Sequence, residues 1–184
     1  MPTDGVRFVA LKEVSRPRTV LAVDLGYSSE RRSCGIAVSD DSRSACWTFG
    51  DALTEVARIL TNVPRTILVL EGVLSTSHCD KGNPRDRGAF EKGRSWYYGP
   101  GAVTFLAATR FLAELGKLLP STQVVDLAEA FLSNKQKRSG HQTDASLIAK
   151  RFWSRRPEPL VEGVEPILPI ISGVPPVRSF AYHR

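Results

Sequence analysis

Two short, almost entirely apolar runs limit the folds that are open to this chain. They are TVLAVDL at residues 19–25 and TILVLE at residues 66–71. A strand without polar alternation is buried on both faces, which is typical of the parallel strands of α/β proteins. We therefore expect both runs to be central strands of one sheet that is covered by helices on each face.

Shorter segments predict the neighbouring strands. Residues 34–39 (CGIAVS) and 44–49 (SACWTF) are strand-like, and short links join them to each other and to residues 19–25. Short links favour antiparallel pairs, so these three segments predict a meander. Residues 122–128 (TQVVDLA) predict a fifth strand.

Three segments carry helical signals. Asp51 is expected to cap a helix that ends at Pro64, because apolar residues recur between them at helical spacing. Residues 102–119 predict a mostly apolar, buried helix, and a third helix is expected to start near Thr143. The third helix has apolar residues at i, i+3, i+4, i+7 and i+8, which predict a core stripe: Ala145, Ile148, Ala149, Phe152 and Trp153.

The order of these elements predicts an α/β protein with a five-stranded mixed sheet flanked by helices. Strands one to three form the antiparallel meander, and the crossover helices make strands one, four and five parallel. We expect residues 1–156 to be one domain and residues 157–184, which are rich in proline and aliphatic residues, to be a C-terminal arm. The arm would pack on the domain or on the second subunit of a homodimer.

Acidic residues stand where the two apolar strands end. Asp24 is near the end of the first strand, and Glu71 ends the fourth. The carboxyl ends of parallel neighbours meet at one edge of a sheet, roughly 5 Å apart. Two carboxylates at that distance repel each other unless a proton or a cation lies between them. A hard divalent ion with oxygen ligands meets this need.

The segment GHQTDA, residues 140–145, adds two candidates. His141 and Asp144 are three residues apart, so they can share one face of the first turn of the third helix and reach the same edge. Asp24, Glu71 and Asp144 would then suit two magnesium ions, the arrangement that hydrolyses phosphodiester bonds. Each residue also has a structural alternative. Asp24 could take part in a turn, and Glu71 could be a strand-end acid that faces water. Asp144 could favour the helix dipole, and His141 could be a cap or a surface residue.

The basic residues are concentrated in two segments. Residues 133–156 hold seven basic residues and one acid. The net charge of this segment is therefore +6, the same as that of the whole chain. Residues 73–101 form a long irregular segment in which cations alternate with aromatic residues. Cations that bind phosphates and aromatic rings that stack on bases predict a nucleic-acid surface. The alternatives are a solvated helix face and a loop with its aromatic residues turned inward. The predicted nucleic-acid contacts are Lys81, Arg85, Arg87, Lys92, Arg94, Lys135, Lys137 and Arg138.

Other features bear on the cellular compartment. The chain has three cysteines and no CxxC pair, which favours a reduced, cytoplasmic setting. No apolar run has the length of a membrane helix, and the N-terminal residues contain no apolar core of a signal peptide. We therefore expect no membrane partner.

Four motifs together resemble the RNase H-like nuclease superfamily, and within it the RuvC-type Holliday-junction resolvases. The motifs are LAVDLG, CGIAVSD, LVLEG and HQTDASLIA, and the resemblance spans residues 19–153. In that branch an Asp lies on the first strand, a Glu ends the fourth, and an acid or a His-x-x-Asp pair opens the last helix. The matching residues here are Asp24, Glu71, His141 and Asp144.

The resemblance implies a metal-dependent endonuclease that uses Mg²⁺ or Mn²⁺ and acts on nucleic acid, DNA rather than RNA. Asp24, Glu71 and Asp144 would bind the metal, and His141 would be a ligand or would position the attacking water. The first motif is also similar to YqgF-type resolvase-like proteins and to actin-like sugar kinases, which need two such domains. Residues 82–101 and the arm have no counterpart in resolvases. The alternative to an enzyme is a non-catalytic relative that binds nucleic acid or protein.

Overall fold

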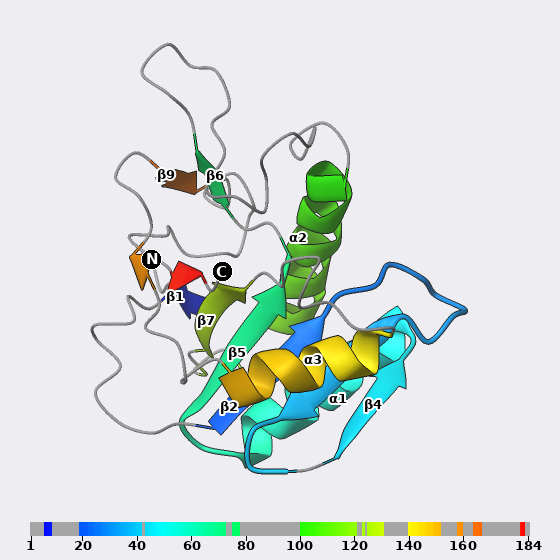
Figure 1. Ribbon diagram of the computed structural model, residues 1–184. Helices are drawn as coiled ribbons and strands as arrows, with labels where there is room; N and C mark the ends of the chain where they lie inside the picture. Colours follow the sequence, from blue (N-terminus) through cyan, green and yellow to red (C-terminus); the bar gives the residue numbers. More distant parts are fainter. Residues whose placement is uncertain are drawn as a thin grey trace.

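The structure of the chain is a computed structural model, and a six-stranded sheet forms its centre (Figure 1). The strands of this sheet are β1 (Val6–Phe8), β2 (Thr19–Asp24), β3 (Cys34–Val38), β4 (Ser44–Trp47), β5 (Thr66–Glu71) and β7 (Val125–Ala130). The helices are α1 (Phe49–Asn62), α2 (Pro100–Leu118) and α3 (His141–Arg151). The residues that the structure describes are 6–8, 19–41, 43–72, 75–77, 100–120, 123, 125–130, 140–151, 158–159, 164–166 and 181–182.

The predicted α/β class and mixed sheet are confirmed. The strand order is β1-β7-β5-β2-β3-β4, in which β2, β5 and β7 are parallel and β2, β3 and β4 form the antiparallel meander. The sixth strand, β1, pairs in parallel with β7 at the edge of the sheet and was not predicted. It has only three residues, too few to show a strand period in the sequence.

Within the described part of the chain, four short strands lie outside this sheet. They form two antiparallel pairs, β6 (Ser75–Ser77) with β9 (Val164–Pro166) and β8 (Glu158–Pro159) with β10 (Ala181–Tyr182). The β6 strand belongs to a segment that was predicted to be irregular, and the other three belong to the predicted arm. Among the described residues, no helix has both the length and the apolar character needed to cross a membrane.

Alternate residues of the central strands face opposite layers of helices. In β2, Leu21 and Val23 join a core cluster with α1 and α2, whereas Val20 and Ala22 join a second cluster with α3. The strand β5 alternates in the same way. In Figure 1, α3 accordingly lies in front of the sheet and α1 lies behind it. The predicted stripe of α3 is confirmed for its described residues, since Ala145, Ile148 and Ala149 are buried in the second cluster.

The start of α1 differs from the prediction. Thr48, not Asp51, is the N-cap, and its Oγ1 accepts a hydrogen bond from the backbone N–H of Asp51 at 3.2 Å. The same hydroxyl donates to Oδ2 of Asp51 at 2.7 Å. The two residues thus cap the helix together, and Asp51 lies in the first turn, where the helix dipole favours an acid. The other helix starts also differ by two residues, at Pro100 for α2 and His141 for α3.

Candidate metal centre

Asp24 and Glu71 lie side by side at the carboxyl edge of the central strands. They are direct partners in the register of β2 and β5, and each is the last residue of its strand. The alternation of the two strands turns both side chains toward the layer of α3, since Ala22 and Val69 face the same way. The parallel neighbours thus bring the two acids together as the sequence predicted.

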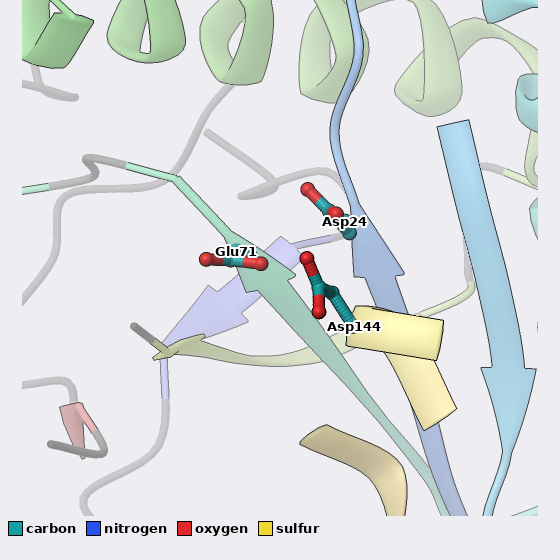
Figure 2. A group of neighbouring side chains, drawn as sticks. All are labelled: Asp24, Glu71 and Asp144. Atoms are coloured by element: carbon teal, nitrogen blue, oxygen red, sulfur yellow. The ribbon is translucent and has the colours of Figure 1, made fainter. Parts of the chain in front are cut away.

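Asp144 completes the cluster from the opposite direction. It lies in the first turn of α3, and Figure 2 shows its carboxylate beside those of Asp24 and Glu71. Each of the three residues offers one oxygen, and these oxygens all lie within 4.8 Å of one another. The exposed fractions of the three residues are only 4% to 7%. We call this set the carboxylate cluster.

Gly140 sets the first turn of α3. Its φ of 108° lies in the region that favours glycine, and its carbonyl oxygen accepts hydrogen bonds from the N–H groups of Thr143 at 3.1 Å and Asp144 at 3.2 Å. The helix therefore begins immediately after the glycine. Asp144 consequently lies within the first turn, close to the end of the sheet.

Gly35 allows α3 to approach the sheet closely. It pairs with Asp24 across β2 and β3, and a Cβ atom at this position would overlap the carbonyl group of His141 and lie 2.8 Å from the N atom of Gln142. The side-chain amide of Gln142 also donates to the carbonyl oxygen of Ser44 in β4 at 2.7 Å. This role of Gly35 was not predicted from the sequence, although a glycine inside a strand is a signal of a close backbone approach.

His141 contacts the cluster through Asp24. Its Nδ1 atom lies 2.9 Å from Oδ2 of Asp24 in a hydrogen bond, and 44% of its side chain is exposed. His141 is not one of the three residues that could together hold a metal ion. The contact therefore orients one carboxylate of the cluster and leaves the imidazole ring in contact with solvent.

The electrostatics of the cluster favour a hard cation. Three buried carboxylates with oxygens within 4.8 Å of one another repel each other when they are charged, and a cation among them would relieve this repulsion. Burial raises the pKa of the nearby Cys34 thiol to about 11, and the negative charge of Asp24 adds to this shift. Cys34 therefore stays a neutral thiol, which donates to the carbonyl oxygen of Gly26 at 3.2 Å. The donor set is oxygen alone, which suits Mg²⁺ or Mn²⁺ rather than a soft metal.

The predicted nucleic-acid contacts lie outside the described residues. Five of them fall within residues 78–99 and three within residues 131–139. They are Lys81, Arg85, Arg87, Lys92 and Arg94 in the first segment and Lys135, Lys137 and Arg138 in the second. Their assignment as phosphate contacts stays a prediction.

Comparisons with known proteins return no relative: no protein-family model, no curated protein and no solved structure matches this chain. The interpretation of the site therefore depends on its geometry and on the chemistry of its side chains.

Proposed function

We propose that this chain is a divalent-metal-dependent nuclease that hydrolyses phosphodiester bonds of nucleic acid. The observation that carries the proposal is the carboxylate cluster, in which Asp24, Glu71 and Asp144 are buried with oxygens within 4.8 Å of one another. The cluster lies at the carboxyl edge of parallel strands, the edge at which open α/β sheets bind their ligands. Three acids at this place suit the binding of cations that act on a phosphate group.

We further propose that the fold is RNase H-like and that the RuvC-type resolvases are the most similar branch. The antiparallel meander of β2, β3 and β4 and the parallel arrangement of β2, β5 and β7 support this assignment. The positions of the acids on β2, β5 and the start of α3 support it as well. The edge strand β1 is an addition to the five strands that the resemblance implies.

The side chains have distinct roles in this proposal. Asp24, Glu71 and Asp144 hold the metal ions, which when bound lower the pKa of a water molecule and stabilise negative charge on the leaving oxygen. The hydrogen bond between Nδ1 of His141 and Oδ2 of Asp24 fixes the orientation of that carboxylate. Because β2, β5 and α3 place the three acids before any ligand binds, little ordering is needed on binding.

A cleavage assay tests the proposal. Purified protein would be incubated with labelled single-stranded, duplex and branched DNA and with RNA, in the presence of Mg²⁺ or Mn²⁺. We expect the wild type to cleave at least one substrate and the Asp24→Asn variant to fall to the level seen without metal. Glu30→Gln, which changes an exposed acid of the neighbouring loop, is the matched control and should retain activity.

Equal cleavage by the wild type and by Asp24→Asn would overturn the proposal, because the activity would then come from a contaminant. Binding of nucleic acid without cleavage, and without Mn²⁺ uptake that depends on Glu71 and Asp144, would support the non-catalytic alternative. Calorimetric titration with Mn²⁺ distinguishes these outcomes.

A further inference from the structure

An exposed aromatic ring lies in the loop that follows Asp24. Tyr27 follows Asp24 by three residues in the loop between β2 and β3, and 64% of it is exposed. Three residues of chain span at most roughly 11 Å, so the two Cα atoms are no farther apart than that. This upper limit on the Cα–Cα distance corresponds to the length of about three nucleotides of a stacked strand.

One side of the Tyr27 ring packs on another aromatic ring. It packs edge-to-face on Phe49, with centroids 5.6 Å apart at 84°, and Phe49 packs in the same way on the fully buried Phe111. The backbone N–H of Phe49 donates to the carbonyl oxygen of Ser28 at 3.0 Å. This row of rings connects the exposed tyrosine to the core, so its position is fixed before any ligand arrives.

The rest of the loop is also anchored and carries positive charge. The hydroxyl oxygen of Ser28 accepts hydrogen bonds from the N–H groups of Glu30 at 3.3 Å and Arg31 at 2.9 Å. The side chains of Arg31 and Arg32 are exposed. Their guanidinium groups therefore lie in the same loop as the ring and near the end of β2.

Two hollows adjoin Tyr27, and both are also lined by Arg110 of α2. The first has a volume of about 520 Å³ and an apolar wall that includes the exposed residues Val103 and Leu106. The second has a volume of about 610 Å³ and a more polar wall that includes Ser29. Arg110 is paired with Glu114, which also lines the second hollow, at 3.0 Å. The aromatic ring and the aliphatic wall match the flat face of a base.

We infer that Tyr27 stacks on an unpaired base of the nucleic acid whose phosphate lies at the carboxylate cluster. This inference rests on the proposed function and adds a substrate class, single-stranded or locally unpaired DNA, because a base within a duplex does not expose its face. Arg31 and Arg32 would contact the adjacent phosphates. The exposed guanidinium groups of Arg31 and Arg32 in this loop favour nucleic acid over an apolar protein segment as its ligand.

Binding measurements on the full chain without divalent metal test the inference. The probes are a fluorescein-labelled oligothymidine strand and a blunt duplex, and the readout is fluorescence anisotropy. Tyr27→Ala should weaken binding of the single strand by roughly 5- to 150-fold, the range of one lost base-stacking contact, and should change duplex binding much less. Tyr27→Phe keeps the ring and should bind within about twofold of the wild type by the same stacking argument.

Leu118→Ala is the matched control, since Leu118 is another exposed apolar residue on α2 but lines neither hollow. Thermal unfolding followed by circular dichroism verifies that each variant is folded. If Tyr27→Ala binds the single strand as well as the wild type does, the inference is overturned. Ultracentrifugation that shows self-association lost in Tyr27→Ala, with single-strand binding unchanged, would assign the surface to a second copy of the chain and overturn it as well.

Failure of the inference and failure of the proposed function are distinguishable. The binding assay contains no metal, so it does not depend on the carboxylate cluster. Cleavage that requires Asp24 but not Tyr27 would leave the proposed function intact and reject the stacking role. Single-strand binding that requires Tyr27, without any metal-dependent cleavage, would support the stacking role and reject the proposed function.

Discussion

At the scale of single residues, the carboxylate cluster brings together buried acids whose mutual repulsion a bound cation would relieve. Asp24, Glu71 and Asp144 are each less than a tenth exposed, and their oxygens are mutually close. Burial disfavours a charged carboxylate, and each neighbouring acid disfavours it further. A cation that binds the folded chain and not the unfolded chain would therefore stabilise the fold.

The Glu71→Gln variant should separate the structural and metal-binding roles of the cluster. Without metal, it should be at least as stable as the wild type, because the repulsion between Glu71 and the carboxylates of Asp24 and Asp144 is removed. With Mn²⁺ at about 100 times its Kd, the wild type should gain about 2.7 kcal/mol, which raises the Tm by roughly 5 to 10 °C for a chain of this size. Glu71→Gln should gain almost nothing. Differential scanning calorimetry with and without Mn²⁺ measures both effects.

The control for this experiment is Glu30→Gln, whose carboxylate is exposed. It should respond to Mn²⁺ as the wild type does. A Tm shift of equal size in wild type and Glu71→Gln would contradict a metal site at Glu71.

At the scale of elements, the close contact between β3 and α3 positions Asp144 and His141. Gly35→Ala should disturb it, because the added methyl group meets the backbone of His141 rather than a flexible side chain. We expect a loss of about 1 to 3 kcal/mol of stability, as for overpacked sites. The Mn²⁺ affinity should fall roughly 10- to 100-fold, as when residues that orient metal ligands are changed. Urea unfolding and calorimetric titration measure the two effects.

Gly116→Ala in α2 is the matched control, since a Cβ at Gly116 meets no atom within 4 Å. An alanine inside a helix should stabilise the protein by about 0.5 to 1 kcal/mol and leave Mn²⁺ binding unchanged. If Gly35→Ala bound Mn²⁺ with wild-type affinity, the proposed role of this contact would be rejected.

The elements themselves could largely be predicted from hydrophobic patterns. The runs that form β2 and β5 are apolar throughout, and α1 keeps a regular helical spacing, so both signals are strong. The cap of α1 could not be decided, because Thr48 and Asp51 are both capping residues at the right spacing and bond to each other. The contact at Gly35 could not be predicted either, since it depends on how closely the start of α3 packs on β3.

At the scale of the whole molecule, the convergence of the acids was predictable only in part. Parallel pairing of β2 and β5 makes Asp24 and Glu71 neighbours once each is read as a strand end. The approach of Asp144 depends on the return of the chain from β7 to α3, which no local pattern specifies. The position of the Tyr27 ring likewise depends on its contact with Phe49, which packs on Phe111, and both residues are distant in sequence.

The positive charge of the chain leads to a prediction about how the binding of nucleic acid depends on salt concentration. If Lys135, Lys137 and Arg138 contact phosphates, their joint replacement by alanine should weaken binding of a single strand. It should also reduce the slope of log K against log salt by up to about 2, because fewer counterions are released. Binding titrations over a series of salt concentrations measure the slope.

Arg43→Ala combined with Arg58→Ala is the control for the salt series. These guanidinium groups form ion pairs with Asp41 at 2.8 Å and Glu55 at 2.7 Å, so they offer little free charge to a phosphate. The slope of this double variant should equal that of the wild type. An unchanged slope in the triple variant would rule out the assigned phosphate contacts.

The most direct measurement is anomalous diffraction from crystals grown with Mn²⁺, because it locates ions without assuming a substrate. We predict an anomalous peak among Asp24, Glu71 and Asp144, with carboxylate oxygens about 2.0 to 2.6 Å from it. The peak should be absent from crystals of the Glu71→Gln variant. Well-ordered crystals in saturating Mn²⁺ with no peak at these three residues would contradict the claim that the cluster is a metal centre.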